Sequence, residues 1–191
     1  MILWGVAAFL YFYIGRTIPM ERRHLVWCVL DDYVPFVAAF SVPYVAWYAM
    51  QAFTAWHCFR KERKIFRRFI GYILFGYACA IATFLLYPSA IAFRPEITEK
   101  DLFSRLVGLV YQMDEPTNVF PSLHVIVSMG VAFALCQTKA YGKPALKVFW
   151  WVIALSISAS TVLIKQHSVL DILAAIPVCS VGYVLFFTKT A

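Results

Sequence analysis

Two short phrases of this sequence place histidines where they could transfer a phosphoryl or acyl group. The first, residues 120–124, reads FPSLH, and the second, residues 167–171, reads HSVLD. Side chains four residues apart share one face of a helix, so Asp171 can accept a hydrogen bond from one ring nitrogen of His167. The other ring nitrogen is then left as a base or nucleophile. Because both phrases lie at ends of strongly apolar segments, they predict chemistry on a lipid at the rim of a bundle of membrane helices.

The first phrase has the composition of a helix N-terminus. Pro121 suits the first helical position, because the N–H group that proline lacks would be unpaired there. The free N–H groups of such a turn favour binding of a phosphate, and Ser122 could add a hydroxyl donor. His124 would face the same phosphate site. Each phrase alone also has a purely structural interpretation, as an ordinary helix start or as a helix-capping acid paired with a histidine.

The composition predicts an integral membrane protein. Of 191 residues, 62% are hydrophobic and only 14% are charged, which is more apolar surface than a soluble domain of this length can bury. The net charge of +7 does not indicate a nucleic-acid partner, because the basic residues fall between apolar runs and form no separate arm. Basic loops at a membrane surface explain them better, so membrane lipids are the expected partners.

The apolar runs predict an all-α fold, namely a six-helix integral membrane bundle that forms one domain over residues 1–191. Pro35 and Pro43 predict a kinked or partly re-entrant second span. The first apolar run has no basic leader, so we expect a retained span there. The six expected spans cover residues 2–18, 33–58, 69–90, 120–137, 147–165 and 168–188.

A short amphipathic helix is expected between Pro95 and Asn118, before the fourth span. Apolar residues recur there at helical spacing, and Thr98 is a plausible N-cap. The helix could lie at the membrane surface and gate lipid entry, or it could pack on the bundle as an ordinary loop helix. The sequence leaves both possibilities open.

Charge in the loops predicts the orientation of the bundle. Residues 60–68 hold six basic side chains and are expected to form a cytoplasmic loop, as is the basic loop 139–144. Six spans then put both termini in the cytoplasm. Both histidine phrases fall on the opposite, extracytoplasmic or lumenal face.

Taken together, the motifs resemble the type 2 phosphatidic acid phosphatase superfamily, which includes lipid phosphatases and sphingolipid head-group synthases. Members have six membrane helices and a pattern of three parts. In chain order the three parts are matched by Arg94–Pro95, by Pro121, Ser122 and His124, and by Ser160, His167 and Asp171.

This resemblance implies a mechanism. His167 would attack phosphorus while Asp171 holds its tautomer, and His124 would protonate the leaving oxygen and then activate water or an acceptor alcohol. Arg94, Ser122 and the helix N-terminus would bind the phosphate oxygens. No metal and no other cofactor is implied. The substrate would be a phospholipid or another lipid phosphate.

Two positions depart from the phosphatase pattern, because Tyr87 and Thr161 replace a lysine and an arginine. Fewer cations weaken binding of a monoester more than of a diester, since the monoester carries more negative charge. In these respects the chain is similar to the inositol phosphorylceramide synthase branch. Lys165, and also Lys100 or Arg105, could restore the charge. We expect hydrolysis of lipid phosphate esters, with head-group transfer to an alcohol or sphingolipid as the alternative.

Two other classes of protein remain as rivals. His124 and His167 could be metal or haem ligands, or the chain could be a non-catalytic lipid-binding scaffold. The acid pairs 31–32 and 114–115 are expected to be solvated loop charges, since neighbours in sequence do not face each other on a helix.

Overall fold

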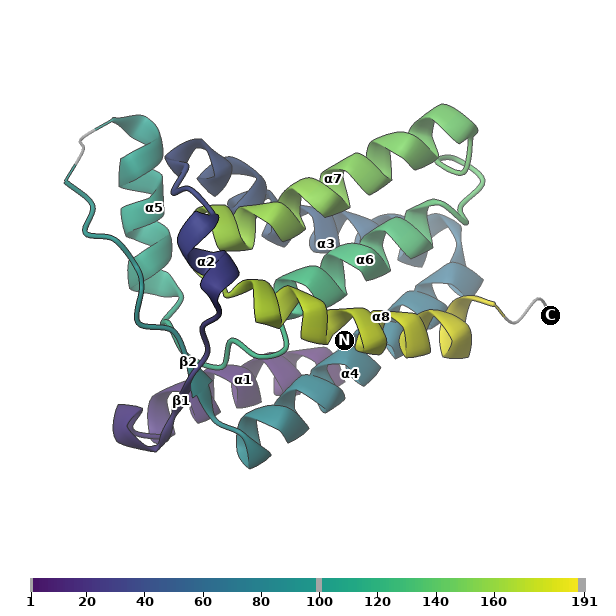
Figure 1. Ribbon diagram of the computed structural model, residues 1–191. Coiled ribbons are helices and arrows are strands. Elements are labelled where there is room, and N and C mark those ends of the chain that lie inside the picture. The colour runs from purple at the N-terminus through teal and green to yellow at the C-terminus, as the bar shows by residue number, and fades with distance from the viewer. Residues whose placement is uncertain (1, 99–100, 189–191) are drawn as a thin grey trace.

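The computed structural model describes residues 2–98 and 101–188. Six long helices make up most of the molecule (Figure 1). They are α1 (Ile2–Thr17), α3 (Ser41–Lys61), α4 (Arg63–Leu86), α6 (Leu123–Leu135), α7 (Pro144–Leu163) and α8 (Val169–Phe187). Shorter elements join them at one end, namely α2 (Val29–Tyr33), α5 (Leu102–Met113), the 3₁₀ turns η1 (Met20–Arg22) and η2 (Ala38–Phe40), and the strands β1 (His24–Leu25) and β2 (Ser89–Ala90).

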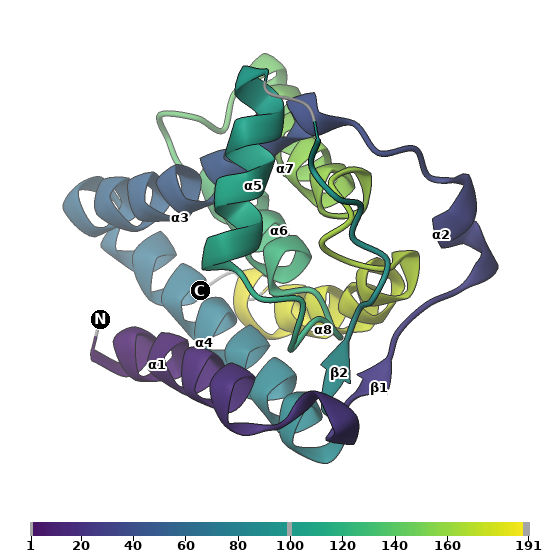
Figure 2. The ribbon, with the colours of Figure 1, turned by 90° about the vertical axis from the view of Figure 1, so that its left-hand side faces the viewer.

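Helix α6 is the central helix of the bundle. It packs against α3, α4, α7 and α8, which surround it when the bundle is viewed from the end that carries α5 (Figure 2). Small residues allow close approach, since a Cβ added to Gly130 of α6 or to Gly182 of α8 would come within 2.6 and 2.7 Å of the Tyr72 ring. The Tyr72 hydroxyl donates to the Ile126 carbonyl at 3.0 Å, which fixes α4 against α6.

The expected all-helical class is confirmed, and the length and composition of the helices support association with a membrane. Three of the described helices, α4, α7 and α8, are long and apolar enough to cross a bilayer. The 13-residue helix α6 spans only about 20 Å, against about 30 Å of hydrocarbon, but neighbouring helices enclose it. Large apolar residues are exposed on the outer faces of α7 and α8, including Val152, Leu155, Leu173, Ile176 and Val184.

The basic stretch 60–68 is helical except at Glu62, where the chain passes from one helix to the next, so the longer loop predicted there is wrong. Helix α3 ends at Lys61 and α4 begins at Arg63. Lysine and arginine are good helix formers, and at helix ends their charges stay in solvent. Arg63 also lies over the Phe59 ring, 3.8 Å from its centre.

The predicted span 33–58 begins too early. Tyr33 ends α2, and residues 34–40 form a connection that contains Pro35 and η2. Helix α3 begins only at Ser41, so Pro43 lies in its first turn, where a missing N–H group costs little. The N–H of Val37 donates to the Leu163 carbonyl at 2.9 Å and thereby holds the connection against the end of α7.

The helix expected between residues 95 and 118 is present as α5, but its N-cap is Asp101 and not Thr98. The Asp101 carboxylate accepts from the N–H groups of Phe103 and Ser104 at 2.9 and 3.2 Å. Hydrogen bonding by Ser104 also lowers the pKa of Asp101. Helix α5 packs on α3 and η2, above the end of the bundle where α6 and α8 begin.

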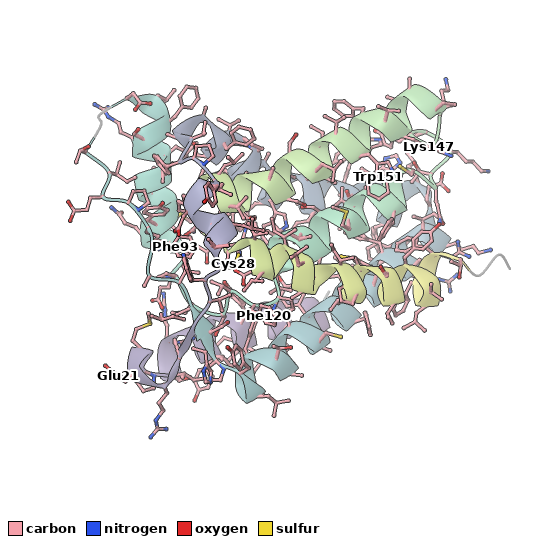
Figure 3. The ribbon with its side chains drawn as sticks, in the orientation of Figure 1. Glu21, Cys28, Phe93, Phe120, Lys147 and Trp151 are labelled. Carbon is pink, nitrogen blue, oxygen red and sulfur yellow. The ribbon has the colours of Figure 1, made fainter. Side chains whose placement is uncertain are left out.

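A two-residue parallel pair, β1 with β2, was not expected from the sequence. It pairs His24 with Ser89 and Leu25 with Ala90, and so joins the segment after α1 to the segment before α5. Figure 3 places Cys28, Phe93 and Phe120 at this end of the bundle and Lys147 at the other. Residues that are far apart in the sequence therefore meet around the starts of α6 and α8.

Candidate active site

His167 and Asp171 form the hydrogen-bonded pair that their spacing predicts. The His167 Nδ1 lies 2.9 Å from the Asp171 Oδ2, and the two side chains are 8% and 0% exposed. His167 precedes Ser168, the N-cap of α8, and the same Asp171 oxygen accepts the Ser168 N–H at 3.0 Å. Asp171 therefore fixes both the helix start and the histidine ring. The Nε2 atom of His167 is left on the side away from Asp171.

His124 lies beside His167, with ring centres 5.8 Å apart. It is the second residue of α6, and the rings of Tyr44 and Trp47 pack on it with centres at 4.2 and 4.3 Å. Its Nε2 atom is buried and has no hydrogen-bond partner among the described residues. Packing thus fixes the ring plane, while one ring nitrogen stays available to a ligand.

Both histidines line a cavity of 270 Å³ between α1, α3, α4 and α6. Four of its lining residues are tyrosine or tryptophan, and its polar groups include Gln51, Asp114 and Asn118. Two further lining residues, Tyr48 and Ala52, lie one turn apart on α3 and are exposed at the molecular surface. The cavity therefore opens at the side of the bundle, over α3.

Ser122 caps α6, because its hydroxyl accepts the Val125 N–H at 3.4 Å. The helix begins at Leu123, so the prediction that Pro121 takes the first helical position is wrong. The Ser122 N–H donates to the Asp171 carbonyl at 3.1 Å, which ties the two histidine phrases together through the main chain. The Ser122 side chain is buried and does not line the cavity.

Arg94 lies behind the cavity wall, with its guanidinium 4.5 Å from the centre of the Tyr111 ring. It donates to the main-chain carbonyls of Asp114 and Tyr111 at 2.7 and 3.4 Å. Its Nε is buried and has no partner among the described residues. Burial lowers the pKa of Arg94, and the nearby charge of Asp114 opposes this shift.

Lys165 lies in the turn between α7 and α8 with a positive φ of 56°. Its ammonium donates to the carbonyls of Asp31 and Val34 at 2.7 and 2.5 Å, so it ties the α2 segment to this turn. Of the other two cations considered, Arg105 is exposed on α5 and Lys100 lies outside the described residues.

The two positions that depart from the phosphatase pattern are occupied in different ways. Tyr87 is 42% exposed and stacks on His24 with ring centres 4.2 Å apart. Thr161 is fully buried in α7, and its hydroxyl donates to the Ser158 carbonyl at 2.7 Å. Neither side chain lines the cavity.

Asp31 is a residue of the site that the sequence did not identify. The expectation of a solvated loop charge is wrong, because the side chain is buried and caps α8. Its carboxylate accepts from the Ser168 hydroxyl at 2.6 Å, the Val169 N–H at 2.7 Å and the Cys28 N–H at 2.9 Å. The only local signal is the i, i+3 spacing of Cys28 and Asp31, which forms a capping box for α2.

Asp114 was also missed, and the same expectation is wrong for it. Its carboxylate lines the cavity and accepts from the hydroxyls of Tyr44 at 2.5 Å and Tyr11 at 3.2 Å. The sequence neighbours Asp32 and Glu115 are exposed, as expected. Because its two partners lie 70 and 103 residues away, no local pattern could have identified Asp114.

The comparisons with known proteins agree with the motifs. A family model described as the PAP2 superfamily matches residues 16–185, a range that includes Arg94 and both histidine phrases. No curated protein and no solved structure gave a match. Since the matched range covers most of the sequence, the chain belongs to the PAP2 superfamily.

Proposed function

We propose that the protein is a membrane-embedded enzyme that hydrolyses lipid phosphate esters through a phosphohistidine on His167, without a metal. PAP2 members are phosphatases or phosphotransferases. The observation that carries the proposal is the orientation of His167, whose Nδ1 is bonded to the buried Asp171 while the ring lines a cavity shared with His124. A carboxylate on one ring nitrogen makes the other a better nucleophile.

In the first step the Nε2 of His167 forms a bond to phosphorus as the bond from phosphorus to the leaving oxygen breaks. His124 gives a proton to that oxygen, and Asp171 stabilises the positive charge that develops on the His167 ring. In the second step His124 takes a proton from water, the resulting hydroxide oxygen bonds to phosphorus, and the P–N bond breaks. Both histidines return to their starting states.

Arg94, Ser122 and Lys165 are the proposed ligands of the phosphate oxygens, together with the N-terminus of α6. Arg94 has an unpaired Nε, and Lys165 has one N–H beyond the two that bind carbonyls. None of these three side chains lines the cavity, so the proposal requires them to move when substrate binds. Catalytic contacts commonly tighten only in the substrate complex.

In the membrane, we propose a six-helix bundle with the active site on the extracytoplasmic or lumenal side and both termini in the cytoplasm. Support comes from charge, because the basic residues 60–68 lie at the end of the bundle opposite the histidines. Helix α5 would lie at the interface beside the site. Its outer face exposes Leu102, Leu109 and Met113.

A second candidate function is transfer of a head group from a phospholipid diester to an alcohol or a sphingolipid. It is favoured by one observation, that no lysine or arginine among the described residues lines the cavity. A monoester with nearly two negative charges needs more cationic contact than a diester with one.

Product analysis by mass spectrometry tests the proposal. Purified protein in chelator would be incubated with a lipid phosphate monoester, mixed phospholipids, and diacylglycerol or ceramide. Inorganic phosphate released by the wild type and not by His167→Ala would support the phosphatase. A new lipid with a transferred head group and little free phosphate would support the transferase. Equal turnover by wild type and His167→Ala would refute both.

A further inference from the structure

We propose that the cavity selects phosphate diesters with a cationic head group, and that Asp114 and the surrounding aromatic side chains hold the cation. This inference rests on the proposed function, because it takes phosphorus to be bound at His167. It concerns the part of the cavity that the proposed chemistry does not use. That part contains one carboxylate and four aromatic residues, which are Tyr11, Trp47, Tyr48 and Tyr77.

The charge of the cavity lining favours a cationic head group. Among the described residues, Asp114 is the one acid that lines the cavity, and no lysine or arginine lines it. The Asp114 carboxylate takes part in none of the ion pairs that these residues form. Arg94 approaches from behind but donates to main-chain carbonyls. A carboxylate beside a phosphate site repels a second anion, whereas a cationic head group would compensate its charge.

The aromatic residues of the lining also favour a cationic head group. Aromatic rings around a carboxylate form an environment in which a quaternary or primary ammonium group is attracted to the ring faces. This attraction grows when the cation is removed from water. An uncharged polyol head group would instead need free hydrogen-bonding groups, but the Asn118 amide already bonds Arg23 and the Tyr11 carbonyl, and the Tyr11 hydroxyl donates to Asp114.

Tyr44 connects the two parts of the site and sets their separation. Its ring stacks on His124 with centres 4.2 Å apart, and its hydroxyl donates to Asp114 at 2.5 Å. The carboxylate therefore lies one tyrosine side chain away from the proposed general acid. Choline and ethanolamine esters place their nitrogen two carbons from the phosphate oxygen, so a head group of this size would reach from the histidines toward Asp114.

The exposed rim supplies a path for the acyl chains. Tyr48 is 45% exposed, and Ala52 is exposed one turn further along α3. A lipid bound with phosphorus at His167 and nitrogen at Asp114 could leave its glycerol and acyl chains in this opening, which faces the side of the bundle. The leaving group would then depart directly into the bilayer.

With such a diester the proposed steps remain balanced. The His167 Nε2–P bond forms as the bond from phosphorus to the diacylglycerol oxygen breaks, and His124 protonates that oxygen. Water or an acceptor alcohol then bonds to phosphorus and gives its proton to His124 as the P–N bond breaks. Diacylglycerol is released in both cases, together with the phosphorylated head group when water is the acceptor or with a lipid that carries this group when an alcohol is the acceptor.

Binding to a variant that cannot turn over tests the inference separately from catalysis. In His167→Ala, quenching of tryptophan fluorescence would be titrated with a short-chain alkyl phosphocholine and with the alkyl phosphate of equal chain length. Trp47 in the cavity wall provides the signal. We expect the phosphocholine to bind at least roughly tenfold more tightly, and Asp114→Asn in the same background to remove this preference. The matched control Glu115→Gln, at an exposed position, should keep it.

The inference is overturned if the alkyl phosphate binds as tightly as the phosphocholine, or if Asp114→Asn keeps the preference. Should Asp114→Asn fail to fold, Tyr48→Leu at the exposed rim replaces it. It should reduce the preference severalfold, and an unchanged ratio of the two dissociation constants would count against the inference.

Turnover by the wild type distinguishes the proposed phosphatase activity from the proposed head-group selection. Monoester hydrolysis without phosphocholine preference would leave the phosphatase standing and end this inference. A preference for the phosphocholine in a protein that turns over no ester would keep the binding inference and refute the phosphatase.

Discussion

Replacing Asp31 with alanine should destabilise the protein and slow its reaction, because this carboxylate holds the start of α8 directly behind His167. The substitution removes three hydrogen bonds, from the Ser168 hydroxyl, the Val169 N–H and the Cys28 N–H. At about 1–1.5 kcal/mol for each bond, the free energy of unfolding should fall by about 3–4.5 kcal/mol. For a chain of this size, that corresponds to a decrease in Tm of at least roughly 6 °C.

The effect on catalysis follows from the same contacts. Ser168 also gives its N–H to Asp171, so loosening this turn misplaces the His167 ring. Displacements of about 1 Å can reduce rates by about a hundredfold, so we expect kcat to fall by about 10- to 100-fold with little change in KM. The assays are thermal unfolding followed by tryptophan fluorescence and steady-state kinetics on a lipid phosphate.

Asp32→Ala is the matched control, because Asp32 is exposed and its carboxylate accepts a surface hydrogen bond from the Trp27 indole at 3.1 Å. Its unfolding free energy should change by less than about 0.5 kcal/mol. If Asp31→Ala and Asp32→Ala gave the same Tm and the same kcat, the argument that Asp31 positions His167 would be refuted.

Four further predictions concern packing, tethering and chemistry. Gly130→Ala should lower the free energy of unfolding by about 1–3 kcal/mol, because its Cβ would lie 2.6 Å from the Tyr72 ring. The control Gly108→Ala should not destabilise the protein, because a Cβ there would meet nothing within 4 Å. Equal Tm values for the two variants would contradict this prediction. Lys165→Met should lower Tm by a few degrees through the loss of two hydrogen bonds and should raise KM, and an unchanged KM would remove Lys165 from the phosphate ligands. His124→Ala should abolish turnover and keep the helical circular dichroism spectrum, so measurable activity would exclude it as general acid. Activity should persist in chelator, and its loss there, restored by added metal, would argue against the metal-free mechanism.

The apolar runs predicted most of the fold, because helix formation in this chain follows hydropathy. The expected spans 147–165 and 168–188 match α7 and α8 to within three residues at each end. The predictions failed where a run of charges was taken as a loop and where Pro35 and Pro43 were taken as a kink within a span. Residues 60–68 remain helical on both sides of Glu62 because solvated cations are compatible with helix ends, and Pro43 fits the first turn of α3.

The site was predicted in part for a similar reason. His167 and Asp171 contact each other across one helical turn, which is a local relation that spacing can predict. Asp31 and Asp114 act on partners more than 60 residues away, and their burial depends on how α2 and α5 fold over the end of the bundle. From the sequence alone they could not be distinguished from their exposed neighbours Asp32 and Glu115.

The most direct test of the central claim is to trap the covalent intermediate. Wild-type protein would be mixed with lipid phosphate, quenched in alkali to preserve phosphohistidine, digested, and mapped by mass spectrometry. We predict an adduct on His167, absent from His167→Ala, whose mass shows whether it carries phosphate alone or a phosphorylated head group. Turnover without any histidine adduct, or an adduct on His124, would contradict the assignment of His167 as the nucleophile.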